Sequence, residues 1–213
     1  MKYILTLIAF SFIFITKAQS DEKSEKILNQ VSKEIKALNS FYLEFSIQIN
    51  NTATGENSNE KGKGYVKGDK FNAEVAGNEL ISNGIKIWTI VHDSEVVYES
   101  DADDDDEESI NPKKLMTLWE TGFKSKYVKE ETLNNQKVHV ISLYPVNPKE
   151  VQYHTITLYI AQGTNELKKA IMKTKDGGTM TYSISKFTKN IDVPADKLIF
   201  DARKYPNYQI IKD

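Results

Sequence analysis

The sequence predicts a mainly β protein in which one antiparallel sheet is accompanied by two helices. Short segments with alternating or β-branched apolar side chains recur along most of the chain. Turn-forming stretches such as Asn83-Gly84 and Lys175-Asp-Gly-Gly178 separate them. Only two segments have the three-to-four-residue apolar spacing of a helix. Strands that follow one another through short turns build an antiparallel sheet.

The N-terminus predicts a secretory signal peptide. Residues 1–3 form a short basic start, residues 4–15 are mainly apolar, and Ala18 offers a small residue for cleavage. We therefore expect a leader over residues 1–18, cleaved near Ala18, and a single domain over residues 19–213. A retained N-terminal anchor is the alternative. No cysteine follows the apolar run, which excludes attachment of lipid at a bacterial lipoprotein signal.

The first expected helix covers residues 21–39. Its apolar residues recur at steps of one, three and four: Ile27, Leu28, Val31, Ile35 and Leu38. Asp21 and Glu22 suit the positive end of the helix dipole.

A strand over residues 41–50 follows, and it alternates without interruption. One face carries Phe41, Leu43, Phe45, Ile47 and Ile49, and the other carries polar residues and Tyr42. Residues 50–57 are polar and predict a hairpin loop. Further strands are expected near residues 61–68, 70–76, 79–82, 85–91 and 95–99.

The second helix is expected over residues 112–120, with Pro112 in its first turn. Strands then follow near residues 125–130, 137–144, 151–160, 167–174 and 179–188. About ten strands spaced roughly 4.8 Å apart form a sheet so wide that it must curl. It either closes into a barrel or curls incompletely and leaves an apolar hollow. Composition does not distinguish these two outcomes.

Composition excludes several classes of function. The chain has 28 Lys and Arg against 30 Asp and Glu, so no basic excess indicates nucleic-acid binding. It has no cysteine, which excludes thiol chemistry and disulfides. No hydrolase or zinc-protease motif occurs, and we expect neither an enzyme nor a cofactor.

The sequence contains two groups of possible metal ligands, but neither has the residues that a metal site requires. The acidic run at residues 101–108 would need glycine where Asp106 stands and glutamate where Pro112 stands to be an EF-hand loop. His139 and His154 would face each other across a hairpin centred near Val146-Asn147, but a third ligand is missing. We expect a solvated loop and two ordinary strand histidines.

The order of several segments resembles a known family. The first helix runs into Ser40-Phe-Tyr-Leu-Glu-Phe45, followed by Gly64-Tyr-Val-Lys-Gly-Asp-Lys-Phe71 and Ile81-Ser-Asn-Gly-Ile-Lys-Ile-Trp88. Leu198-Ile-Phe-Asp201 and Tyr205-Pro206 stand near the C-terminus. Together they resemble the outer-membrane lipoprotein carrier family, LolA, in the form common in Bacteroidetes. The resemblance covers nearly the whole expected mature chain.

This resemblance implies an incomplete, half-open β-barrel with a helical lid, working in the periplasm. Carriers of this family are chaperones of protein transport in outer-membrane biogenesis. As a monomer, the protein would take acylated lipoproteins from an inner-membrane ABC transporter, shield their acyl chains and deliver them to an outer-membrane acceptor. The alternative is a secreted lipid-binding or envelope-stress-sensing module on the same scaffold. A third interpretation is a structural secreted protein whose sheet closes into a barrel and binds no cargo.

The resemblance also implies a set of binding residues. We expect the acyl-chain cavity to be lined by Phe41, Leu43, Phe45, Ile47, Phe71, Val75, Ile87 and Trp88. Leu115, Leu118 and Trp119 would form the lid. Relatives carry an arginine that latches the lid at the position of Lys67; lysine lacks the planar fork of arginine, so we expect a weaker latch. An exposed strand lysine without that role is the alternative.

Overall fold

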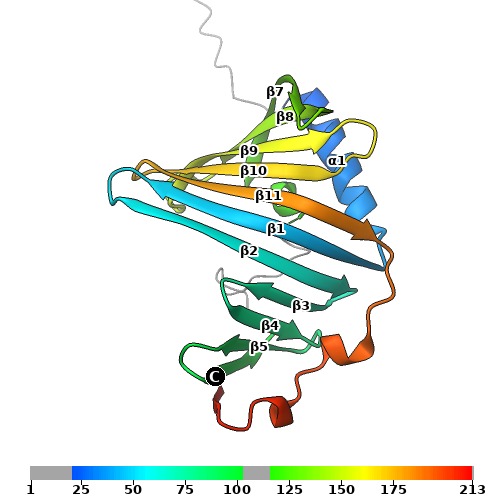
Figure 1. The fold of residues 1–213 in the computed structure, drawn as a ribbon. Coiled ribbons are helices and arrows are strands. Elements are labelled where there is room, and N and C mark those ends of the chain that lie inside the picture. Colours follow the sequence, from blue (N-terminus) through cyan, green and yellow to red (C-terminus); the bar gives the residue numbers. More distant parts are fainter. Residues whose placement is uncertain (1–20, 103–115, 213) are drawn as a thin grey trace, which may run out of the picture.

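A single twelve-stranded sheet makes up most of the computed structural model, which describes residues 21–102 and 116–212 (Figure 1). The elements are α1 (Glu22–Lys36), β1 (Ser40–Asn51), β2 (Glu56–Lys67), β3 (Lys70–Val75), β4 (Asn78–Ser82), β5 (Lys86–Val91), β6 (Val96–Asp101), η1 (Leu118–Glu120), β7 (Phe123–Leu133), β8 (Gln136–Pro145), β9 (Tyr153–Ala161), β10 (Leu167–Thr174), β11 (Gly178–Lys189), η2 (Ala195–Leu198), η3 (Ala202–Lys204) and β12 (Gln209–Lys212). The expected leader, Leu115 and most of the acidic run lie outside the described residues. None of the helices in the described ranges is long and apolar enough to span a membrane.

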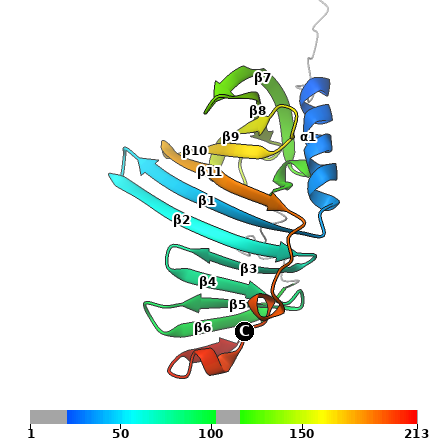
Figure 2. The same cartoon turned by 45° about the vertical axis from the view of Figure 1, so that its right-hand side comes forward.

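The sheet has the strand order β12-β6-β5-β4-β3-β2-β1-β11-β10-β9-β8-β7. β1 lies in the middle and pairs with β2 on one side and β11 on the other. The two end strands, β12 and β7, do not pair with each other. The sheet is therefore curled but not closed, as Figure 2 shows, and the predicted mainly β, open fold is confirmed.

One pairing differs from the all-antiparallel prediction. After β11 the chain crosses to the far edge of the sheet, where β12 runs parallel to β6 (Figure 2). A parallel neighbour requires such a crossover, because a short hairpin joins only antiparallel strands. No strand was predicted over Gln209–Lys212. The sheet is therefore mixed rather than purely antiparallel.

Helix α1 forms where the sequence predicts it and buries the predicted stripe. The Asp21 side chain caps it by accepting hydrogen bonds from the backbone N–H groups of Lys23 and Ser24. Leu28, Val31 and Ile35 are buried against the sheet. This helix covers one part of one sheet face, at the β7 end.

The structure describes only part of the second predicted helix. Of residues 112–120, the described ones begin at Met116, and Leu118–Glu120 form a single 3-10 turn, η1. η1 packs against α1 and β7.

Because side chains alternate along a strand, the sheet has two distinct faces. We call the face that carries Phe41 and Leu43 and packs on α1 the inner face. The face that carries Tyr42 and Glu44 is the outer face. A second apolar cluster on the outer face consists of Ile81, Ile90 and Val97 with Trp88 and side chains of the C-terminal segment.

That segment, residues 190–212, is called the C-terminal strap. An aromatic series holds it against the outer face: Trp88 stacks on Phe200 at 5.2 Å between centroids, Phe200 on Tyr205 at 5.5 Å, and Tyr205 contacts Tyr208 at 5.3 Å. The Tyr208 hydroxyl lies 2.9 Å from His92 Nδ1. The Tyr205 hydroxyl donates to Glu79 Oε2 at 2.8 Å, and burial together with this carboxylate raises the pKa of Tyr205.

Candidate functional site

Strand β1 passes from the core to a partly exposed surface along its inner face. Phe41 is 1% exposed and Leu43 is 7% exposed, whereas Phe45, Ile47 and Ile49 are only half-buried. In Figure 2 the far ends of β1, β2, β10 and β11 extend away from α1. The helix therefore covers only the first part of this apolar face.

The neighbouring strands continue the uncovered surface. Phe45 pairs with Ile184, Ile47 with Tyr182, and Ile49 with Met180 across β1 and β11; Met180 in turn pairs with Met172 of β10. Directly opposed residues lie on the same face. We call this half-buried set the open apolar face; its members are Phe45, Ile47, Ile49, Met172, Met180, Tyr182 and Ile184.

The boundary of the open apolar face on the β2 side is polar. Opposite Ile49 and Ile47, β2 carries Ser58 and Glu60. Gly62 stands opposite Phe45, and a Cβ at this glycine would overlap the Phe45 ring. The ring therefore lies across β2 because Gly62 has no side chain.

The side chains of the open apolar face suit an apolar ligand of variable shape. Met172 and Met180 have unbranched, adaptable side chains. Tyr182 carries a hydroxyl group, and burial raises the pKa of this phenol above its ordinary value. The face offers contact area rather than a set of reacting groups.

The predicted cavity residues fall into three groups. Phe41, Leu43, Phe71 and Ile87 are buried in the main core. Phe45, Ile47 and Val75 are half-buried, and the first two belong to the open apolar face. Phe71 is only 2% exposed and packs as core.

Trp88 lies on the outer face, away from the other predicted cavity residues. Ile87 and Trp88 are neighbours in β5, so their side chains point to opposite faces. Trp88 stacks on Phe200, and its Nε1 donates to Glu99 Oε2 at 3.1 Å. Hydrogen bonds from Lys86 and from Trp88 lower the pKa of Glu99. The structure thus places Trp88 on the face opposite the other predicted cavity residues, and its cavity role stays a prediction.

The described lid residues pack on α1. Trp119 is buried, and its Nε1 donates to Ser32 Oγ at 2.9 Å and to the Leu28 carbonyl at 3.3 Å. Leu118 is half-buried against the same core.

Lys67 is exposed at the end of β2, opposite Ser40 on the outer face. Within the described ranges its side chain makes no hydrogen bond or ion pair, and its role as a latch stays a prediction.

Sequence reasoning missed the part of the open apolar face that β10 and β11 supply: Met172, Met180, Tyr182 and Ile184. The alternation Met180-x-Tyr182-x-Ile184 was available as a sign of one apolar face. What the sequence lacked was the pairing of β11 with β1, which brings these residues beside Phe45 and Ile47.

The histidines do not pair. His139 stands opposite Ile160, because the β8–β9 connection is longer than predicted. His154 contacts Thr155 instead. In the part of the chain that the structure describes, no group of three or more His, Cys, Asp or Glu side chains could hold a metal ion.

In the described residues, an unclosed β-sheet has a helix over one part of its inner face and half-buried apolar side chains beside the helix. This arrangement is that of an open-sheet protein with an apolar face. Residues 19–201 match the family described as "Outer membrane lipoprotein carrier protein LolA". The chain belongs to this family.

Two solved structures with TM-scores of 0.50 or above share the fold at low sequence identity. An uncharacterised conserved protein from Thermus thermophilus has a TM-score of 0.59 and 10% identity, covering 89% of this chain and 98% of that one. LprF from Mycobacterium bovis has a TM-score of 0.50 and 12% identity, covering 83% and 98%. A LolA superfamily protein from Nitrosomonas europaea has a TM-score of 0.44 and 14% identity, covering 84% and 98%. A comparison with curated proteins found no match.

Proposed function

We propose that this protein is a periplasmic, non-enzymatic carrier that shields the acyl chains of lipoproteins and moves them from the inner to the outer membrane. Its leader over residues 1–18 would direct secretion, and the domain over residues 19–213 would carry the cargo. An inner-membrane ABC transporter would load it, and an outer-membrane acceptor would unload it. It would act as a monomer.

The open apolar face is the observation that supports this proposal. Moving an acyl chain out of a lipid phase costs about 0.8 kcal/mol per CH₂. A carrier must offset most of that cost with apolar contacts, yet bind loosely enough to release the chains. Half-buried isoleucine, methionine and aromatic side chains on an unclosed sheet meet both needs.

The proposal is tested by ligand binding with one variant on each face of β1. An environment-sensitive apolar dye should bind the wild-type protein, and long-chain lipids should compete with it. Ile47→Glu places a carboxylate on the open apolar face and should weaken dye binding by about tenfold or more, because the charge must be desolvated. Gln48→Glu, on the outer face next in sequence, is the matched control and should leave binding unchanged. Equal binding by both variants would show that the open apolar face is not the ligand site.

A transfer assay distinguishes a carrier from a lipid-binding sensor on the same scaffold. A labelled lipoprotein is loaded onto the purified protein, and its appearance in outer-membrane vesicles is followed over time. A carrier releases the label to the vesicles. Retention of the label, with lipid still bound, would favour the sensor.

A further inference from the structure

The edge of β2 changes along its length. β2 pairs with β1 over its whole length, from Glu56 to Lys67, but with β3 only from Gly62 to Lys67. β3 ends at Val75, where the chain turns through Ala76 and Gly77. Residues Glu56–Lys61 therefore have no strand partner on the β3 side within the described residues. We call this segment the free β2 edge.

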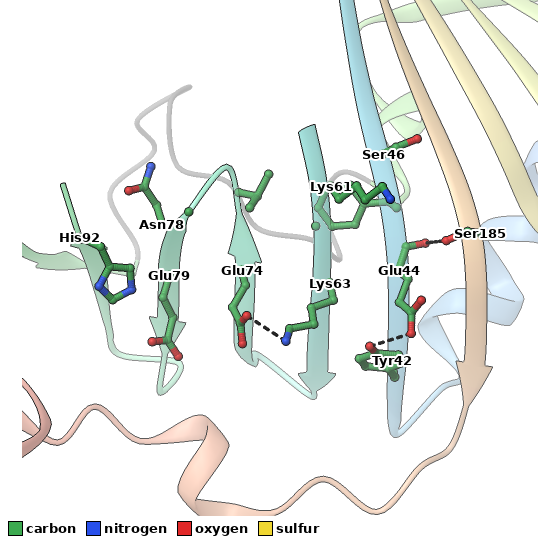
Figure 3. Close-up of a pocket in the computed structure, with 14 residues that line it drawn as sticks. Tyr42, Glu44, Ser46, Lys61, Lys63, Glu74, Asn78, Glu79, His92 and Ser185 are labelled. Carbon is green, nitrogen blue, oxygen red and sulfur yellow. Dashed lines mark hydrogen bonds and ion pairs between the residues drawn. The ribbon is translucent and has the colours of Figure 1, made fainter. Parts of the chain in front are cut away.

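A groove of about 680 Å³ runs across the outer face from β1 to β4 and includes the place where β3 ends beside β2 (Figure 3). Lys61 and Gly62 of β2 and Asn78 of β4 contribute to its lining. Phe45 also lines it, although Phe45 belongs to the inner face, while Glu44 lines it from the outer face. The groove is thus in contact with the open apolar face through Phe45, beside the side-chain-free position Gly62.

The backbone of the free β2 edge is oriented for pairing. The turn at Gly68-Asp69 closes with Lys67 opposite Lys70, which is a hydrogen-bonded pair in two-residue hairpins. Every second residue of β2 counted back from Lys67 therefore directs its N–H and C=O toward the β3 side. Lys61, Asn59 and Asn57 continue this series on the free β2 edge.

The outer edge of β7 is protected in a way that the free β2 edge is not. The β7–β8 register shifts between Tyr127 and Lys129, which marks a bulge. Asp21 occupies part of the β7 edge, since its N–H donates to the Ser125 carbonyl at 3.0 Å and its carboxylate accepts from the Tyr127 N–H at 3.3 Å. β2 pairs with β1 without any shift, so its edge is regular, and no strand of the described ranges occupies the β3 side of Glu56–Lys61, where a strand could be added.

We propose that the free β2 edge binds an extended peptide by strand addition, and that this peptide is the segment that follows the acylated end of the cargo. The inference rests on the proposed function. Acyl chains on the open apolar face contact Phe45, and the polypeptide attached to them must leave this face. Phe45 stands opposite Gly62, which directly follows the free β2 edge in sequence, so the polypeptide can leave along this edge, which is about 20 Å long. Strand addition uses backbone hydrogen bonds, so it accepts cargoes of different sequence.

The test compares a short diacylated peptide with dipalmitoylglycerol and with the same peptide lacking its acyl chains. Wild-type protein should bind the diacylated peptide more tightly than the lipid alone. The double variant Asn57→Pro/Asn59→Pro removes two N–H donors from the free β2 edge and leaves the β1–β2 hydrogen bonds intact. It should weaken binding of the diacylated peptide by about tenfold and leave lipid binding and thermal stability unchanged. Asn57→Ala/Asn59→Ala keeps both donors and is the matched control, which should bind as wild type.

A second readout does not depend on the proline variant. In wild type, binding of the diacylated peptide should slow amide hydrogen exchange at Asn57, Asn59 and Lys61, and binding of the lipid alone should not. The inference is overturned if these amides stay unprotected, or if wild type binds peptide and lipid equally. It is also overturned if the wild-type protein forms a dimer that the proline variant does not, because the edge would then serve self-association. Failure of the lipid alone to bind would instead contradict the proposed function.

Discussion

Phe45 and Gly62 form a contact in which the absence of a side chain has a direct effect. Phe45 is opposite Gly62, and its ring occupies the space that a Cβ at residue 62 would need. Any larger residue at this position forces the ring to move away from β2, and we expect it to move onto the open apolar face. The size of one residue on β2 therefore controls how much of the face is available to a ligand.

Gly62→Val should lower the affinity for an apolar dye while leaving the fold intact. The displaced Phe45 ring would occupy part of the open apolar face, at a cost of about 1 kcal/mol, or about fivefold in Kd. Titration of the dye measures the change, and thermal unfolding checks the fold. In a Phe45→Ala background the valine should have no further effect, because the two sites act through one contact. An equal loss of affinity in both backgrounds would contradict this mechanism.

For single residues, the sequence predicted the sheet face on which a side chain lies better than it predicted the residues that the side chain contacts. Alternation placed Phe45 and Ile47 on one apolar face correctly, because the pattern follows from the geometry of a strand. The same rule applied to β5 would have separated Ile87 from Trp88. Nothing in the sequence indicated that Gly62 would stand opposite Phe45, since this depends on the β1–β2 register.

His139 occupies the region where α1, β7 and β8 meet. Its Nδ1 lies 3.3 Å from the Tyr127 hydroxyl and 3.4 Å from Gln162 Nε2. Lys23 of α1 stands 3.6 Å from the centroid of the Tyr127 ring and 3.9 Å from a Glu130 carboxylate oxygen. Burial lowers the pKa of His139, and this effect outweighs the attraction of Glu130 for the protonated ring.

The docking of α1 should therefore weaken on acidification. A histidine whose pKa is lowered on folding binds protons more readily in the unfolded state, so the free energy of unfolding rises with pH. The protein should lose this stability as the pH falls below about 6.5 toward the lowered pKa of His139. Chemical unfolding at a series of pH values should show that His139→Gln removes this dependence. His154→Gln, at an exposed histidine, is the control and should keep it; a wild-type slope in His139→Gln would contradict the prediction.

The positions of strands rich in apolar residues were predicted correctly, whereas polar strand segments were not recognised. The first six residues of β2, Glu56–Lys61, are mostly Asn, Ser and charged residues, so most of them were placed in a loop or left unassigned. They are a strand because β1 supplies hydrogen bonds along the whole length of β2. Tertiary pairing of this kind overrides local propensity. The same limit led to the misplaced β8–β9 turn, since the turn position depends on how far β9 pairs.

Across the whole molecule, the C-terminal strap links distant parts of the sheet. It leaves β11 near the middle, crosses the outer face over β3 and β4, and ends as β12 at the β6 edge. Ser40 at the start of β1 donates through Oγ to the Ile191 carbonyl, which fixes the beginning of the strap. The strap covers Ile81, Ile90 and Val97, and it supports the sheet from the side opposite the open apolar face.

Phe200→Ala should destabilise the protein without changing ligand affinity. The substitution removes a half-buried ring between Trp88 and Tyr205, at a cost of about 1–3 kcal/mol in the free energy of unfolding. Urea unfolding measures the loss, and dye titration checks that the inner face is unaffected. Ile199→Ala, at a residue that is 58% exposed, is the control and should change neither quantity. A loss of dye affinity in Phe200→Ala would contradict this prediction and would indicate that Trp88 and its neighbours contribute to ligand binding.

The overall architecture was predicted more completely than its edges. The hairpins from β3 to β6 and from β7 to β11 could be predicted because each turn is local and carries its own residues. β12 could not, since Gln209–Lys212 is too short to be recognised and its partner β6 is more than a hundred residues earlier. The open apolar face and the parallel pairing of β12 with β6 both depend on contacts between distant segments.

The central pairing of β1 with β11 has a consequence for how the chain folds. β1–β6 and β7–β11 are each a run of neighbouring strands that form through local turns, and β1 and β11 are the strands that join the two runs. Pairing of residues so far apart in sequence closes a long loop, and such steps are slow compared with hairpin formation. Phe45, Ile47 and Ile49 arrive with the first run, whereas Met172, Met180, Tyr182 and Ile184 arrive with the second. The open apolar face is therefore complete only when the two runs meet, so its assembly reports directly on the slow step that joins them.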